Sequence, residues 1–309
     1  MAISRYDVCY CNAYRWMIPG DCHVAFAPRN DRYKRYVANM VDIFLKINYK
    51  GLTVNLRERL ILMVTDVHAH IMTHNIEGGK RNLLKVAERY GVDRYYISTI
   101  DGAECPDEAT IDLDNKVTAD FMKEQSNLIK GYVYINPRNA NAMDVLKKGI
   151  EEDGMSGVKL WIATYGDDPL VYPIMEKMIE YDKPVLFHTF IKAVGQLRYE
   201  TTSYHIGNIA ERYPESKIIM AHLGGEPYHG IRNVAKYKNV WIDHSGTLVG
   251  SNDLQHTIDL VGVDRVLFGS DMPITYAGAY GQVLEAKLTD EEREKIFWKN
   301  TAELFGEGF

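Results

Sequence analysis

The side chains best suited to chemistry in this sequence are histidines and a carboxylate that come at or directly after short apolar runs. They are His68, His70, His188, His222 and Asp271, with Lys159 inside a further run. Imidazole nitrogens and carboxylate oxygens are common ligands of divalent metals. A single histidine at a strand end is more often a hydrogen-bonded structural residue, but four of them and a carboxylate on separate runs favour a metal centre.

The His68-Ala69-His70 motif fits a strand that reaches such a centre. Residues two apart on a strand point to the same face, so both imidazoles can reach one ion. The elements around the motif must then bring the other candidates to the same place.

Short apolar runs alternate with amphipathic segments from residue 61 onward. The runs are rich in Val, Ile, Leu and aromatic residues, as expected of strands buried on both faces. They are 61–67, 95–99, 131–136, 157–161, 184–188, 217–222, 239–243 and 265–269. The sequence therefore predicts eight strands.

The segments between the runs have apolar residues at helical spacing. They include 80–90, 117–129, 142–152, 170–181 and 204–213, and Asp168-Pro169 is typical of a helix start. Eight such units predict an α/β fold, a (β/α)8 TIM barrel, because closure covers every parallel strand. A doubly wound open sheet is disfavoured because no glycine-rich phosphate turn follows the first run. In a barrel, the candidate residues would meet at the mouth where the strands end.

Two domains are expected. Residues 61–309 form the barrel, and residues 1–60 form an N-terminal extension, with a helix over 31–47, that packs on the barrel or covers its mouth. Nothing in the extension indicates a function.

Composition narrows the class of protein. The 309 residues include 36 basic and 42 acidic residues without a basic block, so nucleic acid is not an expected partner. No run approaches the roughly 20 apolar residues that cross a bilayer, and four cysteines are too few for a disulfide framework. We expect a cytoplasmic protein that acts on a small-molecule substrate, and a homodimer is possible.

Five motifs together carry a family resemblance. They are TDVHAH at 65–70, GVKL at 157–160, VLFHT at 185–189, AHLGG at 221–225 and LFGSDMP at 267–273. This set, in this order, resembles the amidohydrolase superfamily, in particular its amidohydrolase 2 branch of TIM-barrel metal-dependent hydrolases and decarboxylases. The resemblance spans residue 61 to the C-terminus.

The resemblance implies a role for each motif residue. His68, His70 and His188 match metal ligands, and Asp271 matches a carboxylate that binds metal and shuttles a proton. His222 matches a ligand of a second ion in two-metal relatives and an acid/base in one-metal, decarboxylase-like relatives.

Lys159 matches the lysine that two-metal relatives carry as a carbamate bridging the ions. The alternative is an ammonium that pairs with a substrate carboxylate. Trp161-Ile162 stands where this branch often has His-Pro, so no role is carried over to that loop. The ligand set suits one or two Zn²⁺ ions first, with Mn²⁺ or Fe²⁺ as alternatives.

The leading hypothesis is hydrolysis, in which the metal activates water to attack an amide, ester or lactone carbonyl and Asp271 transfers the proton. The alternative is a non-oxidative decarboxylase or hydratase of an aromatic or unsaturated carboxylic acid, with His222 as proton donor. A non-catalytic barrel that only binds a ligand is a third hypothesis.

Several further residues are weaker candidates. Asp66 is expected to orient a histidine or cap a strand, and His244 to face either substrate or solvent at the end of strand seven. Loop residues that could select substrate are Tyr165, Arg198, Glu226 and His229.

Overall fold

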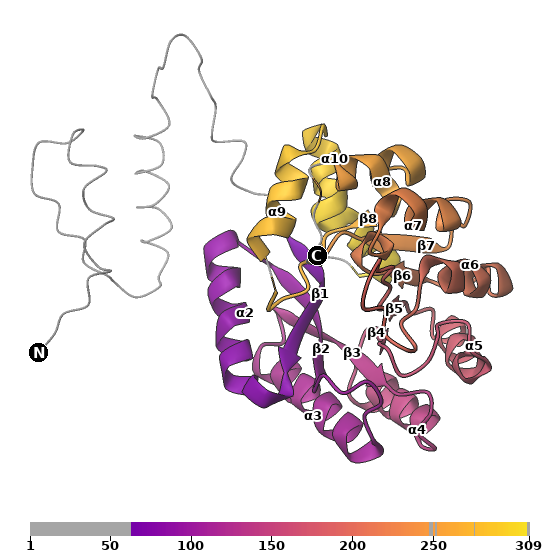
Figure 1. Ribbon diagram of the computed structural model, residues 1–309. Helices are drawn as coiled ribbons and strands as arrows, with labels where there is room; N and C mark the ends of the chain where they lie inside the picture. The colour runs from indigo at the N-terminus through magenta and orange to yellow at the C-terminus, as the bar shows by residue number, and fades with distance from the viewer. Residues whose placement is uncertain (1–62, 247–249, 251, 275, 308–309) are drawn as a thin grey trace, which may run out of the picture. The chain divides into compact units, whose positions relative to one another are not determined.

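The computed structural model describes residues 63–246, 250, 252–274 and 276–307. Eight parallel strands follow one another in chain order around a single sheet, β1 to β8. Helices lie outside the strands, as Figure 1 shows. The predicted (β/α)8 barrel is confirmed.

The first three strands of the barrel are longer than the other five. They are β1 (Thr65–Met72), β2 (Arg94–Ile100), β3 (Ile129–Ile135), β4 (Gly157–Leu160), β5 (Val185–Phe187), β6 (Ile218–Met220), β7 (Val240–Asp243) and β8 (Val266–Leu267).

The α-helices of the described residues include one after each strand. They are α2 (Ile76–Tyr90), α3 (Glu108–Glu124), α4 (Ala142–Lys147), α5 (Tyr172–Glu180), α6 (Ser203–Arg212), α7 (Pro227–Val234), α8 (Asp253–Val261), α9 (Tyr276–Glu285), α10 (Asp290–Glu294) and α11 (Asn300–Phe305).

The barrel closes between β1 and the segment that continues β8. The amide of Val67 donates to the Phe268 carbonyl at 2.9 Å, and the amide of Asp271 donates to the His68 carbonyl at 2.7 Å. A parallel bridge joins Ala69 to Met272. Closure therefore places Asp271 directly beside the His68-Ala69-His70 motif.

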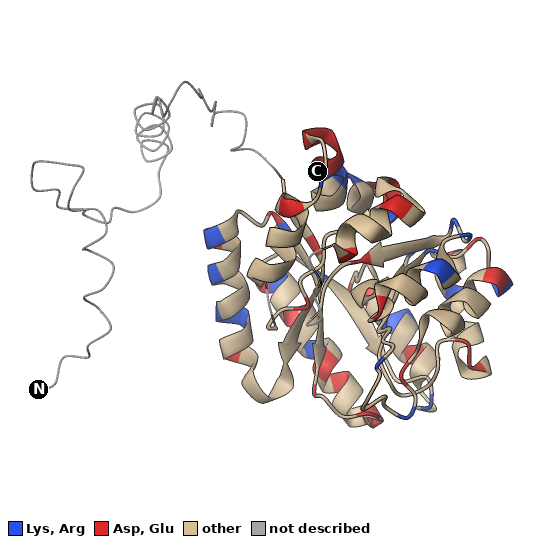
Figure 2. Ribbon diagram, turned by 45° about the horizontal axis from the view of Figure 1, so that its top comes forward, with Lys and Arg blue, Asp and Glu red and all other residues tan. Residues whose placement is uncertain are grey.

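The core has two parts. A large cluster lies between the strands and the surrounding helices, and a smaller one, the inner apolar layer, fills the inside of the barrel. The buried residues of the inner apolar layer are Val67, Tyr96, Tyr132, Leu186, Ile219, Ala221, Leu267 and Leu304. Acidic and basic residues are interspersed over the outer helices, as Figure 2 shows.

Local signals explain where several helices begin and end. Asp168 accepts a hydrogen bond from the Leu170 amide at 2.9 Å, so the predicted start at Asp168-Pro169 is confirmed. Gly91 ends α2 with a φ of 69°, a conformation that glycine adopts without strain.

Predicted and observed boundaries differ most for one helix and one strand. The helix predicted at 117–129 is α3, which begins at Glu108 because the Asp107 side chain caps it by accepting from the Thr110 amide at 2.9 Å. The first strand, predicted to end at 67, continues to Met72, so the histidine pair lies within it.

The predictions for residues 1–60, including the helix over 31–47, lie outside the described residues. No helix in the described part of the chain is long and apolar enough to cross a membrane.

Candidate metal centre

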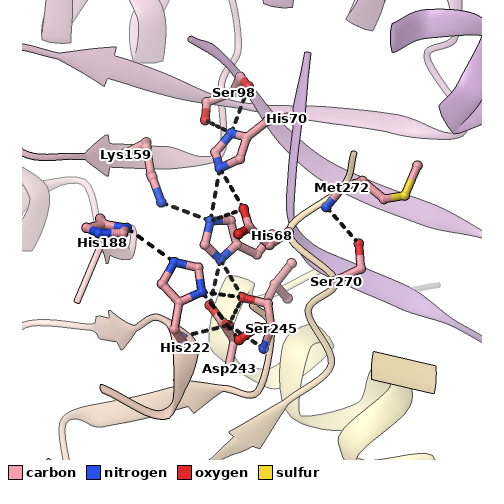
Figure 3. Close-up of polar contacts among 12 residues, drawn as sticks. His68, His70, Ser98, Lys159, His188, His222, Asp243, Ser245, Ser270 and Met272 are labelled. Atoms are coloured by element: carbon pink, nitrogen blue, oxygen red, sulfur yellow. Dashed lines mark hydrogen bonds and ion pairs between the residues drawn. The ribbon is translucent and has the colours of Figure 1, made fainter. Parts of the chain in front are cut away.

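The carboxyl ends of the strands bring the six predicted residues into one buried group, the polar cluster, defined as His68, His70, Lys159, His188, His222 and Asp271. Figure 3 shows five of them converging inside the barrel. The Lys159 Nζ lies 2.9 Å from His68 Nε2, and His68 Nε2 lies 3.0 Å from His70 Nε2. Asp271 Oδ1 is 3.4 Å from His70 Nε2, and His188 Nδ1 is 3.2 Å from His222 Nε2.

The far nitrogens of the two β1 histidines are held by acceptors. His68 Nδ1 lies 3.0 Å from Asp243 Oδ2, and His70 Nδ1 lies 3.1 Å from the Ser98 carbonyl. Carboxylates and carbonyls only accept, so both Nδ1 atoms carry the hydrogen. The two Nε2 lone pairs then face each other across 3.0 Å.

The β5 and β6 histidines repeat this arrangement. His188 Nε2 lies 2.9 Å from Glu200 Oε1, so His188 donates there and turns its Nδ1 lone pair to the cluster. His222 Nδ1 lies 2.9 Å from the Ser245 hydroxyl, which itself donates to Asp243 Oδ1 at 2.5 Å. His222 therefore donates to Ser245 and presents its Nε2 lone pair to His188.

This arrangement fits a bound cation. Lone pairs that face each other repel, and a positive charge between them converts the repulsion into coordination. Ligand atoms of His68, His70 and Asp271 all lie within 4.8 Å of one another. Nitrogen and carboxylate oxygen donors suit zinc, manganese or iron.

Burial keeps the imidazoles neutral. It lowers the pKa of His68, His70 and His222 well below the ordinary value, and a neighbouring positive charge on Lys159 lowers all three further. Burial also lowers the pKa of His188, against the hydrogen bond to Glu200 that raises it. Neutral imidazole is the form that binds metal.

Lys159 and Asp271 are shifted toward their neutral forms. Burial lowers the pKa of the Lys159 ammonium, while the charges of Asp271 and Asp243 oppose the shift. Burial raises the pKa of Asp271, while Lys159 opposes it. A lysine that loses its proton readily suits the carbamate hypothesis, and its contact with His68 keeps the amine beside the metal ligands.

Unusual backbone conformations aim two of these side chains. Asp271 has a φ of 56° and His222 a φ of 61°, in the left-handed region that costs a non-glycine residue about 1 to 3 kcal/mol. Asp66 holds the turn before Asp271 by accepting from the Ser270 amide at 3.1 Å and from the His68 amide at 3.0 Å. The expected supporting role of Asp66 thus acts through backbone amides.

Both expectations for His244 were wrong. Its side chain is buried, with 1% exposure, and contacts the Phe268 ring at 5.5 Å between centroids. Neither ring nitrogen has a hydrogen-bond partner among the described residues. Its neighbours Asp243 and Ser245, which contact His68 and His222, were missed; their spacing of two was the available signal.

The four loop candidates contact residues outside the polar cluster. Glu226 caps α7 and contacts the exposed His229 ring at 2.7 Å. Tyr165 donates to the Arg198 carbonyl at 2.8 Å, and the Arg198 guanidinium lies over the Tyr199 ring. No contact with the cluster is recorded for these residues within the described chain.

A cavity of about 450 Å³ opens onto the polar cluster. Its polar floor includes Lys159, His188 and His222. Its walls include the apolar side chains of Met72, Ile100, Trp161, Pro273 and Ile274. The cavity therefore suits a small ligand with one anionic and one apolar face.

Comparison with known proteins agrees with this architecture. The family model described as amidohydrolase matches residues 65–306. No curated protein matches the sequence.

Solved structures with the same fold include three enzymes of low sequence identity. The 2,6-dihydroxybenzoate decarboxylase from Rhizobium has 17% identity and a TM-score of 0.64, covering 80% of this chain and 99% of its own. A dihydroxybenzoic acid decarboxylase from Polaromonas, with bound manganese and the inhibitor 2-nitroresorcinol, has 17% identity and a TM-score of 0.65, covering 80% and 97%. A 4-oxalomesaconate hydratase from Rhodopseudomonas palustris has 18% identity and a TM-score of 0.61, covering 79% and 96%.

Proposed function

Because the chain belongs to the amidohydrolase family, we propose that it is a metal-dependent lyase that releases CO2 from an aromatic carboxylic acid. The similar structures include decarboxylases and a hydratase, which favours the alternative hypothesis over the hydrolysis we first expected. The observation that carries the proposal is the apolar cavity above the floor of Lys159, His188 and His222.

The cavity is large enough for a small aromatic acid, and its lining combines apolar and polar side chains. A carboxylate that reaches the floor would meet Lys159, while Trp161 and Ile100 would cover the ring and exclude water. His68, His70, His188 and Asp271 would hold one divalent ion, whose charge would orient the carboxylate and an adjacent hydroxyl. Mn²⁺ and Zn²⁺ are the ions to test.

His222 is the proposed proton donor. His222 lines the cavity, and its Nδ1 is held by Ser245, which is hydrogen-bonded to Asp243. Burial lowers the pKa of His222, and the negative charge of Asp243 opposes this and favours the protonated imidazole that the reaction needs. His222 gives its proton to the ring carbon that bears the carboxylate, the carbon–carbon bond breaks, CO2 leaves, and the bonding electrons remain in the ring. His222 regains one proton from solvent in each turnover.

The test supplies the Mn²⁺-loaded or Zn²⁺-loaded protein with hydroxybenzoic acids, unsaturated acids, and ester, lactone and amide substrates. We expect CO2 from an aromatic acid and, in D2O, one deuterium at the vacated ring carbon. The variant His222→Asn should bind metal but release CO2 about 10²- to 10⁴-fold more slowly.

Other products would point elsewhere. Addition of water to an unsaturated acid without CO2 would identify a hydratase. Cleavage of an ester, lactone or amide, with no CO2 from any acid, would return the assignment to hydrolysis.

A further inference from the structure

The segment between β5 and α6, residues 188–202, is organised around one buried carboxylate. The Glu200 side chain is 0% exposed. Its Oε1 accepts from His188 Nε2 at 2.9 Å and from Lys192 Nζ at 2.6 Å. Its Oε2 accepts from Gln196 Nε2 at 2.9 Å and from the Leu197 amide at 3.1 Å. Donors from four positions in the segment thus converge on one side chain.

The contact with His188 fixes the state of that ring. A carboxylate has no hydrogen to donate, so the hydrogen of the neutral imidazole must be on Nε2. Nδ1 then has a free lone pair, and Figure 3 shows the His188 ring facing His222 across the cluster. Without Glu200, the ring could carry its hydrogen on either nitrogen and could rotate.

The base of the segment is held independently of Glu200. The Phe190 amide donates to the Thr201 carbonyl at 2.9 Å, and the Ile191 amide donates to the Gly224 carbonyl at 3.0 Å. A Cβ at Gly225 would lie 2.6 Å from the Ile191 nitrogen, so the two loops are in close contact. These backbone contacts can hold the path of the chain when the Glu200 contacts are altered.

We propose that Glu200 is a positioning residue that presents the Nδ1 lone pair of His188 to the metal. The inference rests on the proposed role of His188 as a metal ligand. Carboxylate partners of metal-binding histidines fix ring orientation and tautomer and raise ligand basicity, and their loss typically costs about 10- to 100-fold in metal affinity. This gain in metal affinity does not require a change in the charge of any metal ligand.

The informative change is Glu200→Gln. One carboxylate oxygen becomes an NH2 group, which cannot accept a hydrogen bond. Whether it replaces Oε1 or Oε2, the two N–H donors that now contact that oxygen lose their acceptor. We expect a loss of about 10- to 100-fold in Mn²⁺ affinity. The matched control is Gln196→Ala, which removes a donor to Oε2 and leaves the His188 contact in place; its Mn²⁺ affinity should stay within about threefold of the parent protein.

A double-mutant cycle separates positioning from charge and from folding. Mn²⁺ affinity is measured by competition with a chromogenic chelator for the full chain, Glu200→Gln, His188→Ala and the double variant. If Glu200 acts through His188, Glu200→Gln costs no further affinity in the His188→Ala background. Glu200→Asp, which keeps the charge but withdraws it by one methylene, is measured in the same cycle in case Glu200→Gln does not fold.

Three results would overturn the proposal. Glu200→Gln could bind Mn²⁺ as tightly as the parent, its loss could persist undiminished in the His188→Ala background, or Gln196→Ala could lose as much affinity. The measurement needs no substrate, so it stands apart from the decarboxylase assay: failure of that assay with an intact cycle would refute the reaction and leave the role of Glu200 in place.

Discussion

The inside of this barrel has two regions that treat buried polar atoms in opposite ways. In the inner apolar layer, each hydroxyl meets an acceptor: Tyr132 donates to the Val67 carbonyl at 2.9 Å, and Tyr96 donates to Glu307 Oε2 at 3.0 Å. In the polar cluster, nitrogen faces nitrogen between His68 and His70 and again between His188 and His222.

This difference separates a region built for stability from one built for chemistry. A buried polar atom with a complementary partner costs little, whereas facing lone pairs and shifted pKa values cost free energy that a bound cation would offset. Left-handed backbone at Asp271 and His222 adds to that cost. Changes in the cluster should therefore affect activity, and changes in the inner apolar layer should affect unfolding.

The largest effect is expected from Asp271→Asn. The amide keeps the shape but lacks the negative charge and is a poorer metal ligand, so we expect kcat/KM to fall about 10³-fold, or about 4 kcal/mol. The metal-free variant should unfold at the same temperature as the parent or higher, because burial raises the pKa of this carboxyl and so disfavours its charge. The rate of CO2 release measures the loss of activity, and calorimetry of the metal-free proteins measures the unfolding temperature.

An Asp271→Asn variant that unfolds several degrees lower while retaining activity would contradict this assignment. Asp271 would then contribute to stability and not to the reaction. Metal content of the variant, measured on the same sample, separates loss of the ion from loss of the carboxylate charge beside a retained ion.

The next effect is expected from Leu304→Ala in the inner apolar layer. Leu304 has 1% exposure, and truncating a buried leucine leaves a cavity that costs about 2 to 5 kcal/mol. Urea denaturation should show this loss in the free energy of unfolding, while kcat/KM of the folded variant stays within about twofold. An exposed leucine of similar size, Leu284 at 50% exposure, gives the control Leu284→Ala, which should cost under about 0.5 kcal/mol.

The sequence was enough to predict the barrel and to place six polar residues together at its mouth, for a physical reason, whereas their roles stay predictions. Parallel strands buried on both faces require continuous apolar runs, and their carboxyl ends must meet at one mouth, so His188 and Asp271 could be placed near His68 without coordinates. The topology of a parallel barrel brings these distant residues together, which the local sequence pattern alone cannot indicate.

The partners of those residues were harder to predict because they depend on distances between segments. Glu200 lies in an irregular segment, where no periodicity indicates which way a side chain points. Asp243 and His244 are adjacent, and only the phase of β7 decides which one faces the barrel interior. The choice of His244 was wrong by one residue, which moves a strand residue to the opposite face.

His244 extends this comparison, because it is a buried imidazole that belongs to neither the inner apolar layer nor the polar cluster. Burial lowers its pKa to about 4, against the nearby charge of Asp243, which raises it. The unfolded chain, with an ordinary histidine pKa near 6.5, therefore binds the proton first as pH falls. The stability due to neutral His244 is fully present above about pH 6.5 and is lost as pH falls from there toward about 4.

His244→Leu removes that proton binding at nearly constant volume. We expect the free energy of unfolding of the parent to fall relative to the variant by at most about 3 kcal/mol between pH 6.5 and 4. Urea titrations of both proteins across this range measure the difference, and contributions from the other histidines cancel because both proteins contain them. Parallel pH profiles would mean that His244 takes up its proton at the same pH in the folded and the unfolded protein. Burial alone would then not lower the pKa of this imidazole.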